Sequence, residues 1–403
     1  MKNIYIITSD HEFKAIEGPA LQVAEGLRAN GARVTIANFF TEDGKQLIQG
    51  MLLEKVDLII GMNPASLNLM LNDKYIHQIL KSKFAILFLD DPIYTKEIWA
   101  ELFLHDFPDD ALLLFVDAKQ CRRFRQVSQL FFNDRFITQF FPWAGRVSTT
   151  KKPIDTEKYY DLVMFSTLDK QIYNNFKDKN ALSENFSEEA CKLGNINHDK
   201  FNPLIIELAV TGFNVDIISI IESESGVEFS IMNENQITLF AEIDSYLKRY
   251  RRINVAKSVL KYSAEANLKV GLYGTGWNLL EDIPGNIQVH TPRQYIDQYE
   301  IFMSSKALIN TDPNWTEGVH DRVFNAFGSN CVAITNKNLY TALNFQDGVD
   351  CSIYSHINQI PDKINSALTN YVDIAKNAHR KLFFNHTWKH RCSFFLDYLH
   401  YVT

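Results

Sequence analysis

Short apolar runs separated by helix-like patterns fill the first 145 residues. Runs at residues 3–8, 33–38, 56–61, 84–89 and 112–116 are bounded by polar or glycine-containing segments and predict short buried strands. Between them, residues 18–31, 64–71 and 118–131 carry apolar positions near helical spacing. Short buried strands that alternate with helices are typical of a parallel sheet covered on both faces. We therefore predict a Rossmann-like domain over residues 1–147.

A polar segment separates this domain from a second one. Residues 148–158 (STTKKPIDTEK) contain a proline and show no periodicity, which indicates a linker. Strand-like runs then occur at residues 159–165, 269–273, 287–289, 307–310, 331–335 and 351–353. These predict a second Rossmann-like domain over residues 159–385. In open sheets of this kind the ligand lies beyond the carboxyl ends of the strands, so we expect a site in a cleft between two facing domains.

Two helical regions accompany the second sheet. Residues 168–266 predict a helical insertion, and residues 386–403 predict a C-terminal helix that crosses back over the domains. The insertion contains the charge run at residues 248–252 (KRYRR). We favour a solvated helical face for this run, and the alternative is a phosphate-facing role.

Composition narrows the possible functions. The chain has 403 residues, is 46% apolar and has a net charge of −7, which disfavours a general nucleic-acid binder. No apolar stretch approaches the length of a membrane span, and the first apolar run is too short for a signal peptide. The five cysteines are scattered and form no CxxC pair. This pattern predicts a cytoplasmic protein without disulfides or a zinc site.

A glycine turn follows the strand predicted at residues 269–273. Gly274, Thr275, Gly276 and Trp277 form this turn, where glycines let backbone N–H groups approach a phosphate or a sugar. The third glycine and the later acidic residue of a dinucleotide fingerprint are missing. The turn therefore disfavours a nicotinamide cofactor, and a purely structural strand-end turn is the alternative.

The strongest candidate site is the loop and helix at residues 310–327. The pattern predicts that the helix begins near Gly318 or Val319. A helix N-terminus favours an anion, and Arg322 supplies a guanidinium that suits phosphate oxygens. His320 is a further donor, and Glu317 an acceptor for sugar or ribose hydroxyls. The alternative is an ordinary helix start that surface charges cap and solvate.

These motifs together resemble a known family. The turn at residues 274–277, the segment GVHDRVFNA at residues 318–326 and the tail NHTWKHR at residues 385–391 carry the likeness. They resemble the glycosyltransferases related to spore maturation protein CgeB, of the GT-B class. The likeness covers the second half of the chain well and the first half loosely. Where many GT-B enzymes have a second glutamate eight positions after the first, this chain has Asn325 after Glu317.

The resemblance implies a reaction and a set of site residues. A sugar would pass from a nucleotide diphosphate sugar to a glycan, a lipid-linked glycan or a protein, without a metal or another cofactor. The second domain would bind the donor and the first the acceptor. Arg322 and His320 would neutralise the leaving diphosphate. The implied donor-binding residues are Gly274, Thr275, Gly276, Trp277, Glu317, Gly318, Val319, Asp321 and Asn325.

The sequence indicates the catalytic base and the aromatic contacts to a ligand less clearly. His11 and Asp91, in loops after predicted strands of the first domain, are candidates for the base, and a cap, turn or surface role is the alternative. Trp277 and Trp315 are candidates to stack on a base or sugar, or else lie in the core. For Trp388 we expect a structural role.

The sequence leaves two other functions open. One is a non-catalytic GT-B protein that binds a nucleotide sugar or a glycan, because fold does not fix function. The other is a different enzyme on the same architecture, such as a sugar-nucleotide epimerase or a nicotinamide-dependent oxidoreductase.

Overall fold

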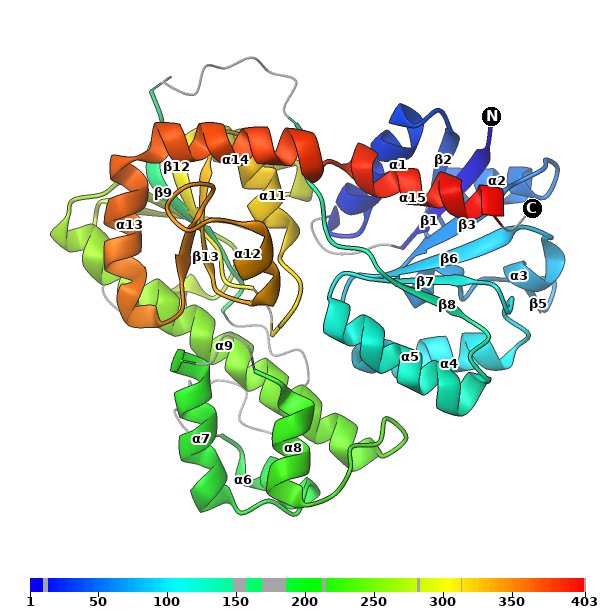
Figure 1. The fold of residues 1–403 in the computed structure, drawn as a ribbon, viewed down its shortest axis with the longest axis horizontal. Coiled ribbons are helices and arrows are strands. Elements are labelled where there is room, and N and C mark those ends of the chain that lie inside the picture. The colour runs from blue at the N-terminus through cyan, green and yellow to red at the C-terminus, as the bar shows by residue number, and fades with distance from the viewer. Residues whose placement is uncertain are drawn as a thin grey trace. The chain divides into compact units, whose positions relative to one another are not determined.

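The chain folds into two compact α/β units, each built on a parallel sheet (Figure 1). The computed structural model describes residues 1–9, 14–147, 157–168, 186–211, 215–280, 283–312 and 314–401. One unit comprises Met1–Val147, Gln294–Asp297 and Leu382–Thr403, and the other comprises Ser148–Arg293 and Gln298–Lys381. The predicted linker at residues 148–158 lies mostly outside the described residues.

The first unit contains a six-stranded sheet in the order β2-β1-β3-β6-β7-β8. Its strands are β1 (Asn3–Thr8), β2 (Arg33–Asn38), β3 (Leu58–Met62), β6 (Lys83–Phe88), β7 (Leu112–Phe115) and β8 (Ile137–Phe140). Its helices include α1 (Glu17–Ala29), α2 (Glu42–Met51), α3 (Ile76–Ile79), α4 (Lys96–Leu104) and α5 (Ala118–Phe132). Strands β3 and β7 are buried at every position, which explains their continuous apolar runs.

Two local features of this unit differ from the sequence prediction. Residues 64–71, predicted as one helix, form a short 3-10 turn (Pro64–Leu67) and the strand β4 (Met70–Leu71), which pairs antiparallel with β5 (Lys74–Tyr75). Asn72 and Asp73, with φ of 51° and 60°, make the tight turn of this hairpin. The edge strand β8 escaped prediction because its burial is partial and its pattern is short.

The second unit contains a six-stranded sheet in the order β11-β10-β9-β12-β13-β14. Its strands are β9 (Tyr160–Phe165), β10 (Val270–Tyr273), β11 (Ile287–His290), β12 (Ser305–Ile309), β13 (Val332–Asn336) and β14 (Ser352–Tyr354). The chain leaves β9 towards one edge and returns to the other side of β9 at β12. Ligands of doubly wound sheets bind beyond the carboxyl ends of the strands at such a reversal. The ends of β9 and β12 are therefore the expected position of a site.

Helices pack against this sheet and extend from it. Beside the sheet lie α10 (Gln298–Met303), α11 (Asp321–Gly328), α12 (Leu339–Asn344), α13 (Ile360–Thr369) and α14 (Tyr371–Asn385). Between β9 and β10 the described residues form α6 (Glu188–Leu193), α7 (His198–Thr211), α8 (Ile217–Ser225) and α9 (Glu234–Glu265), so the insertion is helical. In Figure 1, α6, α7 and α8 gather around one half of α9.

Helix α9 joins this helical group to the core of the second unit. Its residues Ile253, Val255, Ala256, Val259 and Leu260 belong to the same buried cluster as the strands of the sheet and α13. The middle of α9 is thereby held in a fixed place relative to β9. This matters for the charged residues that α9 carries there.

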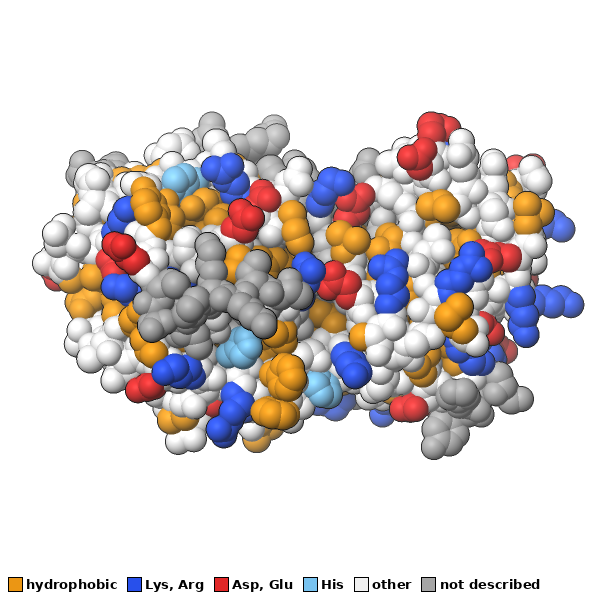
Figure 2. All heavy atoms as spheres, turned by 90° about the horizontal axis from the view of Figure 1, so that it is seen from above, with side chains coloured by type: hydrophobic (Ala, Val, Ile, Leu, Met, Phe, Trp, Pro, Cys, Tyr) orange, Lys and Arg blue, Asp and Glu red, His pale blue; other side chains and the backbone are white. Residues whose placement is uncertain are grey.

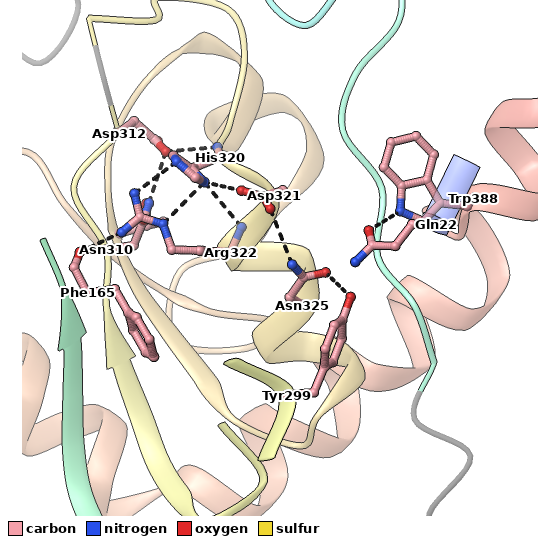
Figure 3. A network of polar contacts seen from close by, with 11 residues as sticks. Gln22, Phe165, Tyr299, Asn310, Asp312, His320, Asp321, Arg322, Asn325 and Trp388 are labelled. Carbon is pink, nitrogen blue, oxygen red and sulfur yellow. Dashed lines mark hydrogen bonds and ion pairs between the residues drawn. The ribbon is translucent and has the colours of Figure 1, made fainter. Parts of the chain in front are cut away.

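The C-terminal helix α15 (Trp388–Tyr401) returns to the first unit and packs on α1. The indole Nε1 of Trp388 donates a hydrogen bond to Gln22 Oε1 at 2.6 Å (Figure 3). A Cβ on Gly26 of α1 would lie 2.6 Å from the carbonyl oxygen of Trp388. The backbones therefore approach closely because position 26 has no side chain.

The surface is chemically mixed. On the face shown in Figure 2, basic and acidic side chains are interspersed with hydrophobic ones. Among the described residues, no helix combines the length and the apolar character that a bilayer span requires.

We predict that Gly26→Ala destabilises the first unit by about 1–3 kcal/mol, because the added methyl group overlaps the backbone of α15. Urea unfolding measures the change. The matched control is Gly50→Ala on α2, where nothing lies within 4 Å of an added Cβ. That variant should be as stable as the wild type, or more stable by at most about 1 kcal/mol. Equal stability of the two variants would show that the contact of α1 with α15 is loose.

Candidate functional site

Buried amide and carboxylate side chains fix the loop that follows β12. Asp312 Oδ1 accepts hydrogen bonds from Asn310 Nδ2 and from the backbone N–H of His320, both at 2.9 Å. Asn338 Nδ2 donates to the carbonyl oxygen of Gly318 at 2.6 Å. Since Asn310, Asp312 and Asn338 are all buried, these bonds hold both ends of the loop in one conformation.

Burial changes the acidity of Asp312. Its removal from water raises the pKa to about 6, although the bonds from His320 and Asn310 and the charges of Arg322 and Arg251 act in the opposite direction. The carboxylate is thus a costly group whose hydrogen bonds only partly offset its desolvation.

Helix α11 begins at Asp321, not near Gly318 or Val319 as predicted. His320 is its N-cap residue, with extended backbone. The helix does not start earlier because His320 has an extended backbone, with φ of −66° and ψ of 142°, and the Gly318 carbonyl oxygen is bound to Asn338. Gly318 has no side chain and that of Val319 is buried, so a contact of either residue with the sugar donor would involve the backbone. Glu317, two residues before Val319, is half-buried.

The side chains at the start of α11 form a hydrogen-bonded series (Figure 3). Arg322 Nη1 donates to the carbonyl oxygen of Phe165, at the end of β9, at 2.5 Å. Arg322 Nη2 lies 2.9 Å from His320 Nε2, and His320 Nδ1 contacts the Asp321 carboxylate. Nδ1 also accepts from the backbone N–H of Arg322 at 3.4 Å, as the cap of α11, and from Arg322 Nε at 3.3 Å.

The imidazole of His320 is neutral in this arrangement. Burial lowers the pKa of His320, and the charge of Arg322 lowers it further, against the opposing effect of Asp321. His320 therefore orients Arg322 as an acceptor. Both ring nitrogens have partners inside the unit, and donation by His320 to a ligand stays a prediction.

Asn325 extends the series into the packing between α10 and α11. Tyr299 Oη donates to Asn325 Oδ1 at 2.7 Å, and Asn325 Nδ2 lies 3.4 Å from Asp321 Oδ2. Asn325 is 0% exposed. Its side chain is enclosed by its partners within the unit, and its contact with the sugar donor stays a prediction. Asp321, only 2% exposed, is likewise an internal partner.

The charge run of α9 also differs from the favoured interpretation. Arg251 is 1% exposed, and its Nη1 donates to Asn314 Oδ1 at 2.8 Å. Arg252 Nη1 donates to the carbonyl oxygen of Thr167 at 3.2 Å. A solvated helical face is thus wrong for Arg251, and Arg252 is partly buried. A charge run inside an otherwise amphipathic helix was the available signal, but it does not identify which residues turn inward.

The glycine turn packs against the end of β9. Gly274 has φ of 128°, and a Cβ there would lie 1.9 Å from the carbonyl oxygen of Ser166. The Thr275 carbonyl oxygen accepts from the backbone N–H of Leu168 at 3.0 Å. Gly276 has φ of 80° and precedes Trp277, which is 2% exposed in the hydrophobic core. The glycines thus permit a close backbone contact, and stacking of Trp277 on a ligand is excluded by its burial.

The remaining candidates occupy other places. Trp315 is buried, with its ring centroid 5.7 Å from that of His320. Asp91 caps the turn after β6, accepts from the backbone N–H of Ile93 at 3.1 Å and pairs with Arg123 at 3.1 Å. This is a capping role, and it gives no support to Asp91 as the base. His11 lies outside the described residues. Within the described ranges, no group of His, Cys, Asp and Glu side chains is arranged to hold a metal ion.

We predict that Asp312 makes the protein less stable as the pH rises from about 4 to about 6. The unfolded carboxyl group loses its proton near its ordinary pKa of 3.8 and the folded one only near 6, so the folded state binds the extra proton in this window. The loss amounts to about 3 kcal/mol. Asp312→Asn should remove this part of the pH dependence in urea unfolding.

The control is Asp373→Asn, an exposed carboxylate on α14, which should keep the wild-type pH dependence. An unchanged dependence in Asp312→Asn would mean that the folded protein ionises Asp312 at its ordinary pKa.

Comparisons with known proteins agree with this fold. Residues 251–397 match the family model described as "Glycosyl transferase-like". The curated proteins give no match at the level of sequence. Among solved structures, the chain is similar to HepE from Anabaena (10% identity, TM-score 0.55, all of both chains covered). It is also similar to a glycosyltransferase from Rickettsia africae (9% identity, TM-score 0.52, 100% of this chain and 98% of that one).

A weaker likeness, with a TM-score of 0.46 and 11% identity, joins 85% of this chain to TarM from S. aureus and covers only 55% of that longer protein. The two full-length likenesses show the GT-B fold, as predicted. The family match bears out the predicted enzyme class, a glycosyltransferase, through residues 251–397, which form a glycosyltransferase-like region.

Proposed function

We propose that the protein transfers a sugar from a nucleotide diphosphate sugar to a glycan, a lipid-linked glycan or a protein, as a member of the CgeB-related group acting in the cytoplasm. The structure of HepE is a complex with UDP and glucose, so UDP is the first nucleotide to test. The observation that carries the proposal is the position of Arg322. Its guanidinium lies at the chain reversal between β9 and β12, beside the N-terminus of α11.

Arg322 suits the chemistry that such a transfer requires. When the bond between the anomeric carbon and the phosphate oxygen breaks, its electron pair stays on the diphosphate, and the sugar takes on oxocarbenium character. The acceptor oxygen then bonds to the anomeric carbon and loses its proton. A preorganised guanidinium stabilises the developing charge on the diphosphate and needs no reorientation during the reaction. Phe165 and the neutral His320 provide this preorganisation.

The surrounding groups keep the charge on Arg322 available. Because His320 is held as a neutral acceptor, the motif carries its positive charge on Arg322. Asp321 is engaged by His320 and Asn325 on the other side of the series. We therefore propose that Arg322 binds the donor diphosphate directly and that His320, Asp321 and Asn325 position it.

We predict that Arg322→Ala folds but releases UDP from a UDP-sugar about 100- to 1,000-fold more slowly than the wild type, because one preorganised donor is lost. Nucleotide release across a panel of UDP-hexoses and acceptors measures the rate, and thermal unfolding checks the fold. Arg322→Lys should recover part of the rate, since the charge remains without the bidentate geometry.

The matched control is Lys376→Ala, an exposed cation on α14, which should keep full activity. Undiminished release by Arg322→Ala would remove the proposed leaving-group role. Nucleotide-sugar binding without any release by the wild type would favour a non-catalytic binding protein.

We further predict that transfer does not require a divalent cation, because Arg322 and the start of α11 supply the positive charge at the leaving group. Dialysis against EDTA should leave the rate within about twofold of that in magnesium buffer, whereas an ion that carried the charge would be worth several kcal/mol. A loss of activity restored by Mg²⁺ or Mn²⁺ would contradict this.

A further inference from the structure

We propose that Arg252 of α9 is a second cation of the donor site and binds the same diphosphate as Arg322. This inference rests on the proposed function. It adds a residue that lies 70 positions before Arg322, at the start of the region that matches the family model.

The two guanidinium groups meet at the same strand end. Arg322 Nη1 donates to the carbonyl oxygen of Phe165 at 2.5 Å, and Arg252 Nη1 donates to that of Thr167 at 3.2 Å. Phe165 is the last residue of β9, and Thr167 follows two positions later. Both cations are therefore directed to the carboxyl end of the strand at which the chain reverses direction in the sheet.

Their mutual repulsion is consistent with this placement. Burial lowers the pKa of Arg252 to about 10, and the charge of Arg322 is the next largest cause. The charge of Asp244 acts in the opposite direction, but this carboxylate is already bound to Lys248 at 2.5 Å and to Asn314 Nδ2 at 2.6 Å. Two cations that raise each other's energy gain most from an anion that contacts both.

The fold holds Arg252 where it is. Its neighbour Arg251 is buried and bound to Asn314, and Ile253 and Val255 lie in the core of the second unit. The backbone at position 252 is thus anchored on both sides. A cation on such a rigid element loses little freedom when it binds a ligand.

The arrangement favours a ligand with two adjacent phosphate groups. The cations come from separate elements, α9 and α11, and converge from them on one strand end. A diphosphate offers oxygens to both cations at once, whereas a monophosphate offers one group. Arg252 is therefore expected to contribute to the discrimination between the two.

The experiment is calorimetric titration of the full-length protein and its variants with UDP and UMP. We expect Arg252→Ala to weaken UDP binding about 10- to 100-fold, as for a hydrogen bond to a charged group, and UMP binding less than about threefold. Arg252→Gln retains an N–H donor for the Thr167 carbonyl oxygen and should show the same selective loss. Lys257→Ala, an exposed cation on the same helix, should bind both nucleotides as the wild type does.

Three results would overturn the inference. Wild-type UDP affinity in both Arg252 variants, with a loss in Arg322→Ala, would leave the proposed function intact and remove Arg252 from the site. An equal loss of UDP and UMP would place the effect of Arg252 outside the diphosphate. If the wild-type protein binds none of UDP, GDP, CDP and TDP, the proposed function fails and the inference fails with it.

Discussion

At the end of β9, the backbone carbonyl groups of three consecutive residues, 165–167, each make a contact on which the site depends. The carbonyl oxygen of Phe165 accepts from Arg322, and that of Thr167 accepts from Arg252. Between them, the carbonyl oxygen of Ser166 lies where a Cβ on Gly274 would be, 1.9 Å away. A side chain at position 274 would displace the segment, and both arginines would lose their anchoring acceptors. The glycine turn therefore contributes to the site through geometry, even though it holds no ligand by a side chain.

The second constraint is the cost of buried charge. Asp312 and Arg251 are buried, and each has a pKa moved towards its neutral form by burial. The unit tolerates them because hydrogen bonds satisfy them, and those bonds in turn fix the loop before α11. His320 carries no buried charge, because burial and the charge of Arg322 lower its pKa and keep the imidazole neutral. The result is a polar interior in which the positive charge is concentrated on arginines near one strand end.

The sequence was sufficient where one physical pattern dominated. All strands of the two sheets except β8 were visible, because burial on both faces makes such sequences continuously apolar, as at β3 and β7. Arg322 was visible because it follows a strand end and a polar loop at the start of a helix. For the charge run that contains Arg252, a phosphate-facing role was the alternative interpretation, but the sequence could not single out Arg252, because its placement depends on which way α9 rolls when its apolar residues enter the core. The edge strand β8 was missed because little of it is buried.

Asn325 illustrates how an apparent departure from a family pattern follows from its neighbours. Its Nδ2 lies 3.4 Å from the Asp321 carboxylate in a fully buried position. A glutamate there would place a second carboxylate beside the first without solvent, and one of the two would have to take up a proton. An amide donates to Asp321 and accepts from Tyr299 at the same time, so both neighbours are satisfied. Asp321 also lies against His320 Nδ1, so the amide is connected to the imidazole that orients Arg322. The choice of asparagine at position 325 is thus linked, through four side chains, to the orientation of the cation at the end of β9.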